Sequence, residues 1–395
     1  MPYIAASPLF LVALSAAGAY CIMGLAWRSG LGDLNDKIAA EFPTRMPGFD
    51  TDGTLASHYT GNARVDQQLA GIVRFFATMT SGELQPLSLF SFWFSGQALA
   101  GLVIMTLDGL RAGNRGKAIS YTALWGLCYQ TITYGITIPI YVAVWLWTSP
   151  LAYMTATETP AREVAAALAL DDADLSVMPH ALIWGYILPT LLAGLPSPAV
   201  VSPEQKNNYL LIWQLFPVWT SLVQLLLSTA ARRLRPRPGS EAAAATATVE
   251  GQKKALTHRL RWVYIFTLTV TTVIHVFAVL YAVVPSLRPE SLAPLDPTAV
   301  TLVNTFKPAQ TPFEAVRPVK SLADGILLLL QYDVYFAGAA FLYWASCQFR
   351  AATEAPTLSS VLIILTGPIG AALTLMWRRD ERLLLDNDEP KVKTN

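Results

Sequence analysis

Charged side chains are scarce in this sequence. Only 14% of the 395 residues are Asp, Glu, Lys or Arg, whereas 53% are hydrophobic. Water-soluble domains carry about 25% charged residues, so this chain has too few to cover a surface that faces water. The formal net charge of +1 gives no reason to expect a nucleic-acid partner. The composition therefore predicts an integral membrane protein.

The sequence also lacks the motifs that mark disulfide, nucleotide or metal sites. Its three cysteines all fall in apolar stretches, and we interpret them as small packing residues. There is no Asn-x-Ser/Thr sequon, glycine-rich phosphate loop, HExxH or CxxC pair. The stretch LDDADL, 170–175, has the wrong spacing for a diphosphate–magnesium site, and we interpret it as a solvated turn. We expect no metal and no cofactor.

Long apolar runs are abundant. About 20 apolar residues are needed to cross roughly 30 Å of hydrocarbon. Eight runs meet this requirement: residues 4–27, 86–108, 118–147, 176–197, 208–230, 262–284, 322–346 and 358–377. The first lacks a basic n-region, so we predict a retained span rather than a cleaved signal. The pattern predicts an all-α fold, a polytopic membrane helix bundle of about eight transmembrane helices.

The domain organisation is simple. We predict a single integral membrane helical domain over residues 1–395, with a flexible Pro- and Ala-rich loop at 232–254 and a polar tail from 378. The mixed stretch QQLAGIVRFFATM, 67–79, predicts a helix that lies at the headgroup level rather than crossing. The sequence leaves the oligomeric state open.

Basic segments do not settle the orientation. If all eight runs cross, GLRAGNRGK at 109–117 and WRRDER at 377–382 share one membrane face. RRLRPRP at 232–238 then lies on the other face, because three spans separate it from the first segment. The positive-inside rule expects such segments on one side, so it gives no orientation here.

Few ionisable residues lie inside the apolar runs, and each is a functional candidate. Asp333, in LLLLQYDVYFAGA, is the most central. A charged carboxylate there costs about 2.5–3.5 kcal/mol, so burial favours the neutral acid, which is a proton donor. His275 is also central, whereas Glu83 and Asp108 flank the second run. The alternative for Asp333 and His275 is a structural hydrogen bond between helices.

Aromatic side chains are frequent inside the runs. The chain has 11 Trp, of which Trp93 and Trp213 are examples far from a predicted interface. Packing explains any single one of them. Together they suit a pocket for an oily ligand that becomes cationic, because an aromatic face stabilises a nearby cation by roughly 0.5–2 kcal/mol.

Several short blocks, taken in order, are similar to a known family. They are GNARVDQQL at 61–69, FSGQALAG at 94–101, LDGLRAGNRGK at 107–117, ALWGLCYQTITYGITIPIY at 123–141, TSP at 148–150 and GYILPT at 185–190. This series resembles the ascofuranone/ascochlorin-type membrane-bound terpene cyclases of fungal meroterpenoid pathways. The resemblance covers roughly residues 60–220.

The resemblance implies cyclisation of a farnesyl or related prenyl chain on an aromatic or cyclohexenone headgroup. Such enzymes protonate a terminal epoxide or alkene, need no metal, and let a carbocation run along the chain. Within the matched region, Asp108 lies in a polar cluster with Arg111, Asn114 and Arg115. Our predicted catalytic residue is Asp333, with Glu83 and Asp108 as competitors. The predicted substrate-binding residues are Trp93, Gln97, Tyr129, Tyr134, Trp213, His275, Tyr332 and Tyr335.

Two other functions stay open. A small-molecule transporter would move its substrate between two halves without chemical change, although the sequence shows no internal repeat. A sterol-isomerase-like enzyme would use nearly the same protonation chemistry on another substrate. In each case we expect contact with membrane lipid, and we expect the protein to lie in the endoplasmic reticulum.

Overall fold

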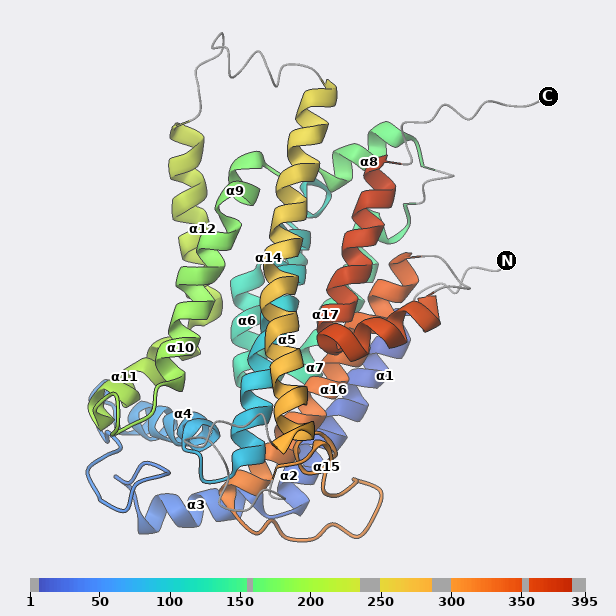
Figure 1. Ribbon diagram of the computed structural model, residues 1–395. Coiled ribbons are helices and arrows are strands. Elements are labelled where there is room, and N and C mark those ends of the chain that lie inside the picture. The colour runs from blue at the N-terminus through green and yellow to red at the C-terminus, as the bar shows by residue number, and fades with distance from the viewer. Residues whose placement is uncertain (1–6, 155–158, 235–248, 286–299, 350–354, 386–395) are drawn as a thin grey trace, which may run out of the picture.

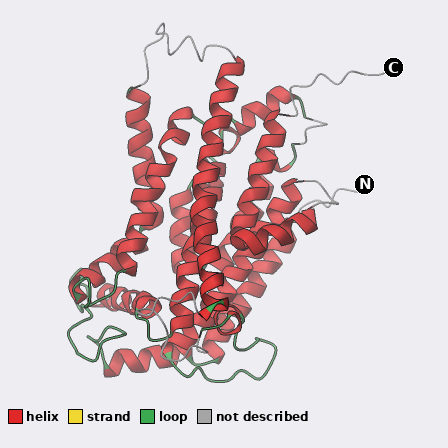
Figure 2. Ribbon diagram, viewed as in Figure 1, coloured by secondary structure: helices red, strands yellow, loops and turns green. Residues whose placement is uncertain are grey.

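A backbone surrounded by hydrocarbon must satisfy its own N–H and C=O groups, and an α-helix does so within one segment. The computed structural model describes residues 7–154, 159–234, 249–285, 300–349 and 355–385. In these ranges every regular element is helical (Figure 2), so the predicted all-α bundle is confirmed. Most of the predicted loop 232–254 lies outside the described residues. Residues 378–385 of the predicted polar tail continue the last helix, and the rest of the tail lies outside the described residues.

The helices follow one another along the chain, with connections of different lengths between them (Figure 1). Their bounds are α1 Pro8–Ala19, α2 Leu25–Arg28, α3 Leu31–Glu41, α4 Ala63–Thr80, α5 Gln85–Leu110, α6 Thr122–Thr131, α7 Tyr134–Thr148, α8 Ala161–Leu168, α9 Asp172–Leu182, α10 Leu188–Gly194, α11 Pro203–Gln214, α12 Phe216–Arg233, α14 Val249–Val283, α15 Leu302–Phe306, α16 Leu322–Phe349 and α17 Ala355–Leu385. Short π-helical turns, Tyr20–Gly24 and Ile183–Ile187, join α1 to α2 and α9 to α10.

The number of membrane crossings is smaller than predicted. Among the described residues, six stretches are long and apolar enough to cross: Pro8–Arg28, Gln85–Leu110, Arg162–Gly194, Leu256–Val283, Leu322–Gln348 and Leu358–Leu383. A seventh candidate is the pair α11 and α12, which is bent by 67° at the break between them. The prediction of about eight spans is therefore not confirmed.

The run 118–147 is the one that does not cross. It forms two short helices, α6 and α7, that meet at Thr133, whose φ of 134° is rare for a β-branched residue. Lys117, just before the run, donates from Nζ to the carbonyl of Thr148, the last residue of α7, at 2.6 Å. Both ends of the run therefore lie at the same end of the bundle. We call residues 118–148 the re-entrant hairpin, and its tip is the turn between α6 and α7.

The hairpin changes which segments share a membrane face. Arg111 at the end of α5 forms an ion pair with Asp380 near the end of α17, and Arg232 at the end of α12 forms one with Asp174 in α9. Arg261 in α14 lies 2.5 Å from Glu381. Arg232 thus lies at the same end as the other basic segments, because 118–147 returns instead of crossing. The opposite placement, which assumed that all eight runs cross, is wrong for this residue, and residues 235–238 lie outside the described part of the chain. We call this end, at the top of Figure 1, the basic end.

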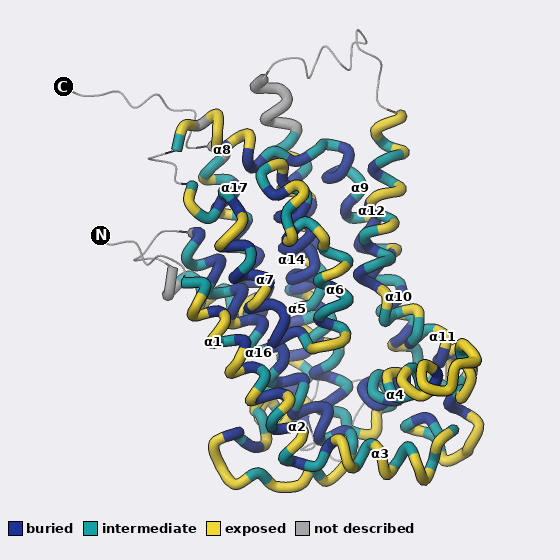
Figure 3. Tube along the Cα trace, turned by 180° about the vertical axis from the view of Figure 1, so that it is seen from behind, coloured by how far each residue is buried: buried dark blue, intermediate teal, exposed yellow. Residues whose placement is uncertain are grey.

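The other end of the bundle carries helices that lie across it. Figure 1 shows α3, α4 and α11 there, at a steep angle to the long helices. The predicted headgroup-level helix 67–79 is part of α4, which begins where the Asn62 side chain accepts the N–H groups of Arg64 and Val65. Buried residues gather along α5, α7 and α16 in the middle of the bundle (Figure 3), and any site shielded from water lies there.

Candidate functional site

Asp333 lies on α16 beside the tip of the re-entrant hairpin. Its side chain is buried, and Oδ1 accepts the backbone N–H of Gly135, in the first turn of α7, at 2.6 Å. The first N–H groups of a helix have no partner within the helix and carry a partial positive charge. Because lipid offers no acceptor at this depth, the carboxyl group satisfies a donor that would otherwise stay unpaired. No described arginine, lysine or histidine lies within ion-pair distance of Asp333.

Two glycines let the hairpin tip pack closely. A Cβ on Gly135 would lie 2.6 Å from the carbonyl oxygen of Asp333, so any side chain there separates α7 from α16. A Cβ on Gly101 of α5 would lie 1.8 Å from the hydroxyl of Tyr134. The tip is therefore held between the middle of α5 and the middle of α16, and Tyr134 is level with Gly101.

Aromatic rings surround this tip. Tyr134 contacts Tyr129 at 5.1 Å and Phe94 at 5.8 Å between ring centroids, and Tyr129 in turn contacts Phe216 at 6.1 Å. We call the connected set the central aromatic cluster: Phe94, Tyr129, Tyr134, Tyr186, Trp213, Phe216 and Phe341. The Tyr134 hydroxyl is buried and has no hydrogen-bond partner among the described residues.

Other predicted substrate-binding residues lie in a second aromatic group, toward the end opposite the basic end. Trp93 contacts Phe306 at 5.2 Å, and Phe90 contacts both Trp93 and Tyr335. The hydroxyl of Tyr335 donates to the carbonyl of Phe306, and that of Tyr332 donates to the carbonyl of Gln310 at 3.0 Å. These two tyrosines fasten the segment 300–320 to α16. They do not face the tip together with Asp333.

Gln97 and His275 hydrogen bond to backbone groups that a break in α17 leaves without helical partners. The break lies at Gly367, with φ 76°, and at Pro368, which has no N–H to donate to the carbonyl of Ile364. The ring nitrogen Nε2 of His275 lies 3.0 Å from that carbonyl oxygen. His275 Nδ1 accepts from the indole of Trp93 at 2.8 Å, so its Nε2 is the donor.

The carboxamide of Gln97 hydrogen bonds to two backbone groups that flank the same break. Its Nε2 donates to the carbonyl of Thr366 at 3.0 Å, and its Oε1 accepts the N–H of Ile369 at 2.9 Å. The predicted binding residues Gln97 and His275 thus already have protein partners. The structure gives both side chains a structural role in the fold.

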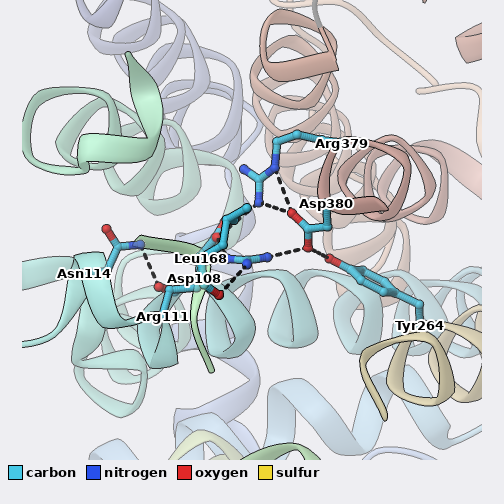
Figure 4. A network of polar contacts seen from close by, with 7 residues as sticks. All are labelled: Asp108, Arg111, Asn114, Leu168, Tyr264, Arg379 and Asp380. Atoms are coloured by element: carbon cyan, nitrogen blue, oxygen red, sulfur yellow. Dashed lines mark hydrogen bonds and ion pairs between the residues drawn. The ribbon is translucent and has the colours of Figure 1, made fainter. Parts of the chain in front are cut away.

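Asp108 belongs to a buried ion network at the basic end (Figure 4). Arg111 donates from Nε to Asp108 at 2.6 Å and from Nη2 to Asp380. Arg379 also contacts both carboxylates, and the hydroxyl of Tyr264 donates to Asp380 at 2.6 Å. Two carboxylates and two guanidinium groups therefore cancel one another inside the bundle.

The two carboxylates keep Arg111 in its charged form. Burial lowers the pKa of Arg111, but the carboxylates of Asp380 and Asp108 outweigh that effect and raise it above its ordinary value. Asn114 donates from Nδ2 to the backbone carbonyl of Asp108 at 2.7 Å, so three of the four members of the predicted polar cluster come together. The fourth, Arg115, is exposed and lies outside the network.

Glu83 is remote from all of these residues. It is exposed just before α5 and accepts the N–H of Gly48 at 2.6 Å, at the end opposite the basic end. With a rise of about 1.5 Å per residue, α5 separates Glu83 from Asp108 by on the order of 35–40 Å. The two carboxyl groups cannot act on one atom of a ligand.

A cavity of about 500 Å³ opens at the basic end, between the end of α5, the start of α6, α9 and α12. It is lined by Thr106, Leu110, Arg115, Ser120, Thr122, Asp171, Asp174, Thr220, Ser221, Gln224, Leu225, Ser228 and Arg232. The interpretation of 170–175 as a solvated turn is wrong. Asp171 caps α9 by accepting the N–H of Ala173, and Asp174 is buried against Arg232.

Comparison with known proteins points to one family. The profile of the CtvD domain matches residues 6–384. The chain belongs to this family. The terpene cyclase ascI of Acremonium egyptiacum is 28% identical over 97% of this chain and 93% of its own length. The terpene cyclase ctvD of Aspergillus terreus is 24% identical over 96% of this chain and 100% of its own. No solved structure matches the chain.

The CtvD family match confirms the predicted resemblance to the fungal terpene cyclases of the ascofuranone and ascochlorin type. A further relative, the terpene cyclase atmA of Aspergillus flavus, is 27% identical over 89% of this chain and 91% of its own length. The matched residues include the hairpin tip, the ion network and the broken helix α17.

Several residues around the site were not predicted. Arg379 and Asp380 lie within the predicted polar tail from 378, and no sequence pattern singled them out as candidates. Phe216 directly precedes Pro217 and Tyr186 lies three residues before Pro189, both within apolar runs, and neither carried a separate signal. Only the block GYILPT, which contains Tyr186, pointed toward one of them.

Proposed function

We propose that this protein is a membrane-bound terpene cyclase that protonates the distal epoxide or alkene of a prenyl chain and closes rings through a carbocation. The names of its relatives support terpene cyclisation as the general activity. The farnesyl-type chain, the aromatic or cyclohexenone headgroup and the acid-initiated mechanism are our own additions. They draw support from a buried acid beside a cluster of aromatic rings.

Asp333 is the carboxyl group best suited to start the reaction. The buried carboxyl groups among the described residues are Asp66, Asp108, Asp174, Asp333 and Asp380. Arginines form ion pairs with three of them, Asp108, Asp174 and Asp380. Asp66 lies on α4, outside the long helices, where Thr60 and Gly61 hydrogen bond to it. Only Asp333 combines burial, the absence of a described cationic partner and a place beside the central aromatic cluster.

The contact with α7 favours proton release. When Asp333 gives its proton to an epoxide oxygen or an alkene carbon, the carboxylate that remains accepts the N–H of Gly135 at the positive end of α7. A donor already in place stabilises the developing charge without reorganisation. The positive charge meanwhile moves onto the substrate, next to the faces of Tyr134, Tyr129 and Phe94. The reaction ends when the cation loses a proton from carbon, or when a substrate hydroxyl oxygen bonds to the cation and then loses its own proton. In both cases one proton leaves for the one that Asp333 added, so the product is an isomer of the substrate.

The variant Asp333→Asn tests the acid separately from the helix cap. Asparagine still offers an oxygen to Gly135 and is as good an N-cap as aspartate, but it has no acidic proton. We expect folded yield close to wild type and turnover reduced by about 10²–10⁴-fold, the usual contribution of a general acid. Asp333→Ala should lose both turnover and folded yield, because the N–H is then unpaired.

The assay uses a farnesylated phenol and its terminal epoxide, with a search for an isomeric product by mass spectrometry. Asp36→Asn, an exposed carboxyl on α3, is the matched control and should turn over like wild type. Turnover by Asp333→Asn within threefold of wild type would show that another group supplies the proton. Absence of any isomer from folded wild-type protein, with both substrates, would contradict the cyclase proposal itself.

A further inference from the structure

The cavity at the basic end lies above the central aromatic cluster. Thr220 of α12 lines the cavity, and one turn away its hydroxyl donates to the carbonyl of Phe216, a member of the cluster. On α5, Thr106 lines the cavity, whereas Gly101 touches Tyr134 at the hairpin tip. Five residues of helix separate Thr106 from Gly101, which is about 7–8 Å along the axis. The cavity is therefore about 7–8 Å along α5 from the hairpin tip, where Gly135 contacts Asp333.

Two polar side chains that line the cavity, Gln224 and Arg115, have hydrogen-bonding groups without a partner among the described residues. Gln224 is buried, its Nε2 donates to the carbonyl of Asp174 at 2.8 Å, and its Oε1 accepts no hydrogen bond from any described residue. Leaving such an acceptor unpaired costs about 1–3 kcal/mol unless a ligand or water fills it. Arg115 lines the same cavity, and its guanidinium has no ion pair or hydrogen bond within the described chain. By contrast, Arg232 is already held by Asp171 and Asp174.

The Oε1 of Gln224 and the guanidinium of Arg115 indicate which chemical groups a ligand of this cavity would carry. The Oε1 of Gln224 needs a donor such as a hydroxyl, and Arg115 needs an acceptor such as a carbonyl or phenolate oxygen. Leu110 and Leu225 supply apolar wall between the polar groups. A volume of about 500 Å³ lies in the range that holds a small molecule. A flat ring with a hydroxyl and a carbonyl, attached to an oily chain, satisfies each of these requirements.

We propose that this cavity is the headgroup site of the cyclase, where Arg115 and Gln224 bind a hydroxylated, carbonyl-bearing ring. This rests on the proposed function. The prenyl chain then extends from the cavity past Phe216 and Tyr134, so that its distal end reaches Asp333. The arrangement sets which end of the substrate is protonated and selects substrates by their polar head.

Binding can be measured without turnover. The probe is a tritiated farnesylated dihydroxybenzaldehyde, bound to purified Asp333→Asn protein so that no reaction competes. Arg115→Met and Gln224→Met should each weaken its Kd by about 10- to 100-fold, the effect of losing one strong hydrogen bond. Arg115→Lys should recover part of the loss. Arg378→Met, another exposed arginine at the basic end, is the matched control and should leave Kd unchanged.

A second ligand separates the headgroup from the chain. Farnesol has the chain without the ring, so its Kd should be the same in wild type, Arg115→Met and Gln224→Met. If the aldehyde probe binds wild type and both variants with Kd values within threefold, the headgroup site is wrong while the cyclase proposal stands. If the probe binds as expected but wild type forms no isomer from it, the site is right and the proposed reaction fails.

Discussion

Removing one arginine from the buried network should cost far more than removing an oppositely charged pair. In wild type, Asp108 and Asp380 are balanced by Arg111 and Arg379, all four of them buried. Arg111→Met leaves two carboxylates facing one guanidinium inside the bundle. Breaking a buried pair in this way costs about 3–5 kcal/mol. For a chain of this size, with an unfolding entropy of about 2.1 cal/mol/K per residue, that lowers the unfolding midpoint by about 4–6 °C.

The double variant Asp108→Asn, Arg111→Met restores the balance. Arg379 and Asp380 then remain as a single pair, with Nη2 and Oδ1 2.7 Å apart. We expect the double variant to recover at least half of the loss seen for Arg111→Met. The assay follows tryptophan fluorescence during heating of the purified protein in detergent, with Arg378→Met as an exposed control. The charge-balance reasoning is refuted if the stability loss of the double variant equals the sum of the losses of Arg111→Met and Asp108→Asn. It is also refuted if Arg111→Met is as stable as wild type.

Three further predictions concern the break in α17, the cation site and the membrane orientation. Gln97→Leu leaves the backbone groups of Thr366 and Ile369 unpaired, so thermal unfolding should show a loss of about 2–5 kcal/mol, whereas an exposed control such as Gln68→Leu should lose under about 1 kcal/mol. Tyr134→Phe keeps the ring and should retain turnover, whereas Tyr134→Ala should change the product ratio measured by chromatography. Because the basic segments share one end, the positive-inside rule predicts that this end faces the cytosol. A cysteine at position 115 should then react with an impermeant maleimide only from the cytosolic side of sealed microsomes.

Hydropathy predicts most of the fold because crossing a bilayer needs length and apolar composition alone. Six predicted spans correspond to continuous apolar stretches, and a seventh corresponds to the bent pair α11 and α12. The run 118–147 has the same length and composition as a true span, so these properties cannot separate a crossing helix from two half-length helices. The turn at Thr133 also lacks the Gly or Pro that usually marks a break, since Gly135 follows it inside α7.

The site was less predictable than the fold because its partners come from distant parts of the chain. Asp333 stands out in sequence as a lone carboxyl group, but nothing near it in sequence indicates that Gly135 is its partner. The short segment around Asp380 looks like a solvated tail until α5 brings Arg111 against it. Gln97 and His275 look like ligand-binding groups because polar residues in membrane spans usually have a function. Their function here is to pair the backbone groups that Gly367 and Pro368 leave free.

The carboxyl group of Asp333, at the middle of the bundle, therefore has a structural role that does not depend on any reaction. A helix that starts halfway across the membrane needs an acceptor for its first N–H groups, and Asp333 supplies it to α7. That requirement alone is met equally well by asparagine. What asparagine cannot supply is a proton. The proposed proton donation is therefore what distinguishes aspartate from asparagine at this position.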